Sequence, residues 1–174
     1  MLPVWSSYYF FTLYANAANG GVGFDARQLR ADEVAGLPQM DRYLLARTRR
    51  LVERVEKSLN EFAISDACDV VSDFIDVLTN WYIRNTRDRF WNEDANAFNT
   101  LYTVLEAFMR VLAPLAPMEA ESVWRGLTGG ESVHLADWPY VVDEKTGADT
   151  ELGRVLVDDP ALVSAMEKVR EVVS

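Results

Sequence analysis

The sequence predicts an all-α protein, an antiparallel helix bundle followed by a small irregular C-terminal extension. Along four long stretches, apolar residues recur three and four positions apart, the spacing that places side chains on one face of a helix. Prolines and paired glycines separate several of these stretches, and both residue types end helices. At 174 residues, the chain is long enough to enclose one hydrophobic core.

Residues 1–38 form the first expected unit, an aromatic helix and a long connection. Aromatic side chains surround most of the helix predicted over residues 2–18, and Asn19-Gly20-Gly21 ends it. A helix that is apolar on most sides is normally buried on several of them. We therefore expect a partner domain outside this chain to cover one face.

Residues 39–130 form the second unit, the bundle itself. Its helices are expected over residues 41–61, 65–91, 94–113 and 117–127. Ser65 with Asp66 is the expected cap of the second of these, because both side chains can accept a bond from a free helix N–H. Pro114 and Pro117 end the third, since proline cannot donate the next helical hydrogen bond.

Residues 131–174 form the extension. Residues 132–139 are short, extended and closed by a proline, and residues 140–158 hold turn signals without a clear period. Asp159-Pro160 has the order of a cap and a first-turn proline, and it predicts a last helix that continues to Ser174.

Cysteine content and hydropathy limit the class of protein. No apolar run approaches the ~20 residues that a membrane helix needs, and the N-terminus lacks a signal-peptide pattern. Cys68 is the only cysteine, so the chain can form neither an internal disulfide nor a cysteine zinc site, and we expect the cytoplasm. No basic residue adjoins Cys68, and we expect a buried, structural thiol there.

The sequence also lacks the constellations of an enzyme. His134 is the only histidine, so neither a di-iron bundle nor a nucleophile with a histidine base is available. No glycine-rich loop opens a helix after a strand, which excludes the usual phosphate loop. We therefore expect no catalytic residue, cofactor or metal in this chain.

The net charge of −10 is unlike the basic footprint typical of nucleic-acid binders. Positive charge nevertheless concentrates in residues 42–57 and 84–89, whereas acidic residues gather in residues 143–159. Because phosphate responds to the local potential, the net charge weakens a nucleic-acid role without removing it.

Residues 80–91 are the most informative stretch. They hold three arginines, Arg84, Arg87 and Arg89, and end in Trp91. Such a cluster beside an aromatic side chain can grip a phosphate backbone and stack an unpaired base. The alternative is that the arginines pair with acids on a solvated face. The pattern favours a core role for Trp81 and leaves both interpretations open for Arg84 and Arg87.

A second basic run lies on the helix predicted over residues 41–61. Arg47, Arg50 and Arg54 recur along one side of it, close to Glu53 and Glu56. Exposed charge is normal on the outer face of an amphipathic helix, and the pattern alone favours that interpretation over RNA binding.

Four stretches together resemble one family. Residues 80–91 resemble the signature of the helical anticodon-binding domain in class I aminoacyl-tRNA synthetases for isoleucine, valine and leucine. Residues 2–16, 40–47 and 132–139 are similar to segments of the isoleucyl-tRNA synthetases: the exit from the catalytic domain, the first bundle helix and a strand motif. The family's two ATP-site motifs and its zinc-binding cysteines are absent, so the resemblance implies a fragment of a larger enzyme.

The resemblance implies a partner and a set of contacts. The partner is tRNA, whose anticodon stem and loop this domain would hold while the rest of the enzyme aminoacylates the other end. Arg84, Arg87 and Arg89 would contact RNA, with Trp91 as a stacking residue and Arg47, Arg50 and Arg54 as weaker candidates.

The resemblance also implies how the rest of the enzyme relates to this chain. Trp5, Tyr8 and Phe11 would pack toward the catalytic domain, and ATP, Mg²⁺ and structural zinc would bind outside this region of a monomeric protein. Two alternatives stay open: the corresponding valyl or leucyl domain, and a helical protein-interaction bundle without an RNA role.

Overall fold

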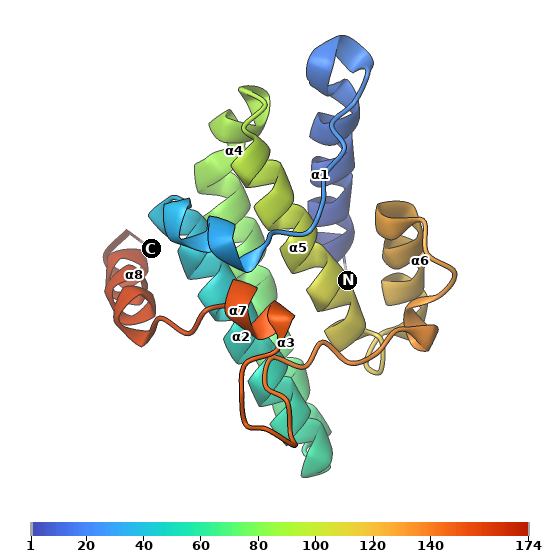
Figure 1. The fold of residues 1–174 in the computed structure, drawn as a ribbon, viewed down its shortest axis with the longest axis vertical. Coiled ribbons are helices and arrows are strands. Elements are labelled where there is room, and N and C mark those ends of the chain that lie inside the picture. The colour runs from blue at the N-terminus through green and yellow to red at the C-terminus, as the bar shows by residue number, and fades with distance from the viewer. Residues whose placement is uncertain (1, 174) are drawn as a thin grey trace.

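A computed structural model describes residues 2–173, and within them all regular structure is helical, which confirms the all-α prediction (Figure 1). The elements in chain order are α1 (Leu2–Gly21), η1 (Ala31–Gly36), α2 (Gln39–Asn60), α3 (Ile64–Asp76), η2 (Val77–Ile83), α4 (Arg84–Trp91), α5 (Ala95–Leu112), α6 (Pro117–Thr128), η3 (Val133–Leu135), α7 (Glu151–Val155) and α8 (Pro160–Val173). In this range the only residues paired as in a sheet are Val142 and Asp149, which form an isolated antiparallel bridge. None of the helices in the described part is long and apolar enough to cross a membrane.

The bundle consists of α2, α5 and a rod made of α3, η2 and α4. The three parts of the rod follow one another without a gap, and η2 is a turn of π-helix. Both α2 and α5 run antiparallel to this rod, so the α2–α3 turn and the α4–α5 turn lie at opposite ends of the bundle (Figure 1). The ends of the long helices agree with the predicted ranges to within a few residues, whereas the π-helical turn and the short elements η1 and α7 have no counterpart in the prediction.

The remaining helices cover two sides of this bundle. α1 and α6 pack against α5, whereas α8 packs against α2 on the far side (Figure 1). Asp159 caps α8 by accepting a bond from the Leu162 N–H at 2.9 Å, as the sequence predicts. Ser174, to which the last helix was expected to extend, lies outside the described residues. The core is rich in large side chains that are fully buried, among them Tyr43, Tyr82, Phe74, Phe90, Phe98 and Phe108.

The helix end predicted at Asn19 is confirmed, but the predicted cap of α3 is wrong. Asn19 has a φ of 54°, in the left-handed region that ends the regular part of α1. Ser65 and Asp66 lie inside the first turn of α3, whose cap position is Ala63. A tight turn causes the shift, because Phe62 has a φ of 58° and the Ala63 N–H bonds back to the Ser58 carbonyl at 2.8 Å.

Two further expectations are corrected. The segment expected to be extended contains the 3₁₀ turn η3, because Glu121 of α6 accepts bonds from the Ser132 hydroxyl and the Val133 N–H and bends the chain there. Cys68 is exposed rather than buried. It stands one position after Ala67, which faces the core, so its own side chain points out of the bundle.

Candidate nucleic-acid interface

The π-helical turn is followed by a helix with one buried and one basic face. Tyr82, Thr86 and Phe90 are buried at intervals of four residues, and this spacing leaves Arg84 and Arg87 exposed on the other side of α4. Neither arginine has an acidic partner within ion-pair distance among residues 2–173. Their guanidinium groups are therefore available to an external anion.

Arg87 is held toward α1 by an aromatic ring. Its guanidinium carbon lies 5.9 Å from the centre of the Phe10 ring, a cation–π distance. Phe10 in turn meets Phe90 edge to face, with ring centres 5.0 Å apart. This chain of contacts places the positive charge of Arg87 at the seam between α1 and α4.

Beside this seam lies an open groove of about 340 Å³. Its walls are mostly apolar and come from the second half of α1, the end of α4 and the α4–α5 turn: Leu13, Tyr14, Ala17, Ala18, Phe90, Trp91 and Glu93. Trp91 is 76% exposed, which is unusual for so large an apolar side chain. The Glu93 carboxylate accepts a bond from the Asn19 N–H at 3.0 Å and ties α1 to the turn. The groove thus offers a flat aromatic surface and a hydrogen-bond acceptor.

Sequence reasoning singled out Trp91 but missed Glu93 and Asn19. Both have positive φ, 56° at Glu93, two positions after the end of α4, and 54° at Asn19, in the non-helical last part of α1. The sequence marks Asn19 as a helix stop and Glu93 as part of a short connection, but neither signal can reveal that the two turns meet.

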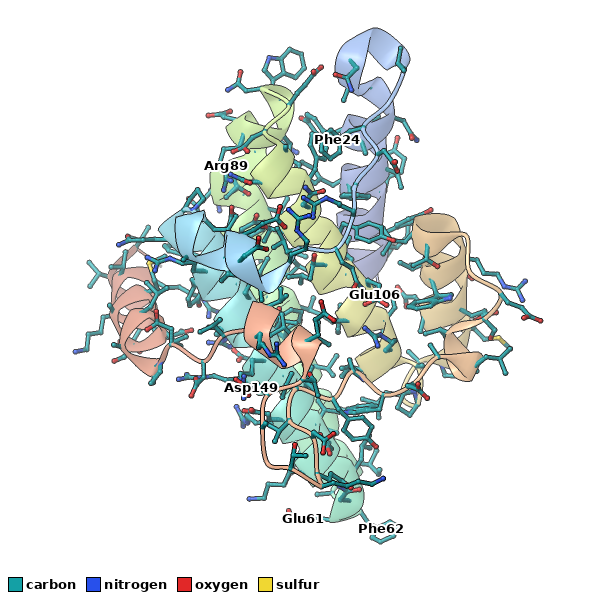
Figure 2. All side chains as sticks on the ribbon, in the orientation of Figure 1. Phe24, Glu61, Phe62, Arg89, Glu106 and Asp149 are labelled. Carbon is teal, nitrogen blue, oxygen red and sulfur yellow. The ribbon has the colours of Figure 1, made fainter. Side chains whose placement is uncertain are left out.

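Arg89, which the resemblance implies to be an RNA contact, is paired with two carboxylates of this chain. Its two terminal nitrogens donate to the two carboxylate oxygens of Asp41, each at 2.7 Å, and its Nε donates to Asp94 at 2.8 Å. Burial lowers the pKa of the Arg89 guanidinium, but these bonds outweigh it and hold the pKa above its ordinary value. Figure 2 places Arg89 where α4 passes the beginning of α2. Arg89 is therefore used inside the bundle and does not belong to the exposed basic face.

The second basic run, on α2, also contains both paired and unpaired arginines. Arg47 pairs with Asp73 of α3 and Glu167 of α8 and is mostly buried. Arg50 is half-buried and Arg54 exposed, and neither has an ion-pair partner in the described part of the chain. An acidic groove of about 590 Å³ between α2 and α3 adjoins Arg54, and its walls include Asp66, Asp69, Asp73 and Glu61. These carboxylates reduce the positive potential there.

The three aromatic residues of α1 that were expected to face another domain lie in three different environments. Phe11 is buried against Phe98 and Tyr102 of this chain, so it packs inward, contrary to expectation. Tyr8 is half-buried, and its hydroxyl lies so close to Gly126 of α6 that a Cβ there would approach it to 1.9 Å. Trp5 stays exposed, in an apolar stripe on the outer side of α1 that comprises Leu2, Trp5, Tyr9 and Leu13.

The structure is a helical bundle with an exposed basic and aromatic end, formed by Arg84, Arg87 and Trp91. Comparison with protein families agrees: residues 41–174 match the family described as the anticodon-binding domain of tRNA ligase. The chain belongs to this family.

The most similar relatives found include three proteins named isoleucine–tRNA ligase. That of Bifidobacterium longum (strain NCC 2705) is 94% identical over 174 residues, which are 100% of this chain and 16% of the relative. That of Leifsonia xyli subsp. xyli is 45% identical over 180 residues, 100% of this chain and 14% of the relative. That of Nocardia farcinica is 42% identical over 172 residues, 99% of this chain and 14% of the relative. The chain thus spans about one sixth to one seventh of the length of these relatives.

Proposed function

We propose that this chain binds the anticodon stem and loop of a tRNA at the end of the bundle where α4 meets α1. The observation that carries the proposal is the juxtaposition of Arg84 and Arg87, which have no ion-pair partner among residues 2–173, with the groove beside Trp91. Guanidinium groups bind phosphate in a forked geometry, and an exposed aromatic ring stacks an unpaired base. RNA loops present both features together, a bent backbone and splayed bases.

Glu93 adds a means of reading a base that enters the groove. One of its carboxylate oxygens accepts the Asn19 N–H, and the carboxylate has further lone pairs available. A base stacked on Trp91 would present its amino or imino N–H at the edge of the ring, where a carboxylate can accept it. Such a contact favours bases with a donor on that edge.

The acidic net charge is compatible with this role because of where the acids lie. Asp66, Asp69 and Asp73 flank the groove near the α2–α3 turn, at the end of the bundle opposite the α4–α5 turn (Figure 1). Phosphate is repelled there and attracted to the basic end, so the charge distribution orients the RNA.

For the whole protein we propose a monomeric, cytoplasmic isoleucine–tRNA ligase. The relatives carry that name, and the chain spans about one sixth to one seventh of their length, which leaves room for a catalytic domain that uses ATP with Mg²⁺ and for a structural zinc site. The exposed stripe around Trp5 on α1 would pack toward the catalytic domain, since contiguous exposed apolar side chains mark a contact surface.

The RNA contacts are tested with the variant Arg84→Ala/Arg87→Ala and a labelled isoleucine anticodon stem-loop. We expect affinity to fall by about tenfold for each arginine–phosphate pair that the variant removes. The dependence of affinity on salt should become shallower by roughly one unit of slope for each of these pairs. Arg154→Ala, which removes an exposed arginine on α7, is the control and should leave both quantities unchanged.

The alternatives predict other outcomes. A helical interaction bundle without an RNA role predicts no difference between the double variant and the control. Preference for isoleucine is tested with the whole protein, which should charge isoleucine tRNA over valine and leucine tRNAs. Preferential charging of either of the others would overturn the assignment.

A further inference from the structure

A buried carboxylate lies beneath the basic face of α4. Asp41 is 0% exposed, and both of its oxygens accept bonds from Arg89 at 2.7 Å. The Tyr82 hydroxyl donates a third bond to Asp41 at 2.8 Å. A buried charge is tolerated only with such a set of partners, so the three side chains form one interdependent cluster.

The cluster joins α2, α4 and the N-terminus of α5 at this end of the bundle. Asp41 belongs to the first turn of α2, Tyr82 to the π-helical turn η2 and Arg89 to α4. Arg89 also binds Asp94, whose side chain caps α5 by accepting the Asn96 N–H at 2.9 Å. The orientation of α4 is therefore tied to α2 and to α5 at a single point.

The two residues of the rod that reach Asp41 enclose the exposed basic residues in sequence. Tyr82 stands two positions before Arg84, and Arg89 stands two positions after Arg87. Because both ends of this short segment are attached to the same carboxylate, the segment cannot rotate about the helix axis without breaking a buried bond.

Because of the π-helical turn, the attachment to Asp41 affects the direction in which Arg84 and Arg87 point. A π-turn is rarer than an α-turn and holds one extra residue, so its presence changes the direction in which all later side chains of the rod point. Tyr82 lies within that turn, between Val77 and Ile83. Its bond to Asp41 therefore acts at the place where the direction of Arg84 and Arg87 is decided.

We propose that Asp41, Tyr82 and Arg89 are positioning residues, which set the rotation of α4 so that Arg84 and Arg87 face the same RNA backbone beside Trp91. This inference rests on the proposed function. It assigns no RNA contact to Arg89 and gives the buried acid Asp41 a favourable role in binding a polyanion.

The competing explanation is that Arg89 contacts phosphate directly, and the two explanations differ in sign. Asp41→Asn removes a negative charge and one of the two carboxylates that hold Arg89, so that Asp94 alone remains paired with it. Direct contact then predicts tighter RNA binding with a steeper dependence on salt. Positioning predicts weaker binding with a shallower dependence, because Arg84 and Arg87 no longer act together.

The experiment measures binding of a labelled isoleucine anticodon stem-loop to this chain at two salt concentrations, well below the unfolding temperature of each variant. For Asp41→Asn we expect about tenfold weaker binding, comparable to the loss of one charge-assisted hydrogen bond. For Tyr82→Phe, which leaves the ion pair in place and keeps the proposal testable if Asp41→Asn does not fold, we expect about threefold weaker binding. Arg89→Lys keeps the positive charge but cannot make the paired bonds to Asp41. We therefore expect it to bind the stem-loop more weakly than the unaltered chain.

Controls separate positioning from general stability. Phe108→Leu destabilises the core of the bundle away from the cluster and should leave affinity and salt dependence unchanged. The inference is overturned if Asp41→Asn tightens binding, if Asp41→Asn and Tyr82→Phe leave it unchanged, or if Phe108→Leu weakens it equally. Failure of the unaltered chain to bind the stem-loop would overturn the proposed function and this inference with it.

Discussion

Arg47 of α2 and Glu167 of α8 form an ion pair that attaches the C-terminal helix to the bundle. Glu167 also accepts the Tyr43 hydroxyl at 2.7 Å, and Arg170 on the same helix pairs with Asp76 of α3. α8 is therefore held by charged groups as well as by its buried residue Val163. This attachment accounts for the low exposure of Arg47, which as an isolated residue on an amphipathic helix would extend into solvent.

Glu167→Gln should loosen α8. The amide keeps the shape of the side chain but loses the charge, and both partners are more than two-thirds buried, so we expect the free energy of unfolding to fall by about 1 kcal/mol. Hydrogen exchange of the α8 amides should become faster while that of α5 stays slow. Glu171→Gln, an exposed position on the same helix, is the control; an equal loss there would contradict a specific role for Glu167.

Ionisation of the buried Tyr43 hydroxyl should lower the free energy of unfolding in strong base. Burial, together with the bond to Glu167, raises the pKa of its hydroxyl from 10.0 to about 12. Because the pKa in the folded protein lies above that in the unfolded chain, the stabilisation is complete below about pH 10 and is lost as pH rises through about 12. Between these values, the free energy of unfolding should fall by about 2 kcal/mol more in the native chain than in Tyr43→Phe.

The measurement for Tyr43 is urea unfolding at several pH values. Burial also raises the pKa of Tyr82, but Tyr82 is present in both proteins, so its effect cancels in the comparison. The exposed residue Tyr9 offers a control, and Tyr9→Phe should behave like the native chain. Parallel pH profiles for the native chain and Tyr43→Phe would contradict the prediction.

Arg49 should hold the irregular segment 140–158 onto the bundle. Its guanidinium donates to the carbonyls of Gly153 and Leu156 at 3.0 and 3.3 Å and to Asp149 at 2.8 Å (Asp149 is labelled in Figure 2). Arg49→Met leaves buried carbonyls without a donor, and we expect a cost of about 2 kcal/mol. Limited proteolysis should then cut within residues 143–158, whereas the control Arg154→Met should remain intact.

Trp91→Ala should weaken RNA binding without weakening the fold. Stacking of one base on an aromatic side chain contributes about 1–3 kcal/mol, so affinity for the stem-loop should fall by about tenfold or more. The side chain is 76% exposed, and the change in stability should stay within about 0.5 kcal/mol. Trp91→Phe keeps a ring and should retain most of the affinity; an alanine variant that binds normally would remove Trp91 from the interface.

The helices were predictable because their signals are local. Proline and glycine interrupt the chain where they stand, and apolar residues three and four positions apart lie on one face whatever else the chain does. The stop at Asn19 and the cap at Asp159 are such signals, and both were confirmed. The cap at Ser65 failed because the tight turn at Phe62 starts the helix earlier, and Cys68 failed because exposure depends on a single step around the helix.

The candidate site, too, was predictable only in its local features. The sequence located a basic cluster and an aromatic residue at the end of one helix, and the RNA contacts of Arg84, Arg87 and Trp91 stay predictions. It could not indicate that Arg87 lies over Phe10, or that Glu93 meets Asn19 across a separation of 74 positions.

By itself, then, the sequence determined which long segments are helical and which of them carry positive charge. Only the tertiary structure decided what each charge meets. Arg84 and Arg89 are the same residue type on the same short helix, yet one is exposed and the other is bound to a buried carboxylate. The physical reason is distance along the chain, because Asp41 stands 48 positions before Arg89 and reaches it only when α2 and α4 have packed together.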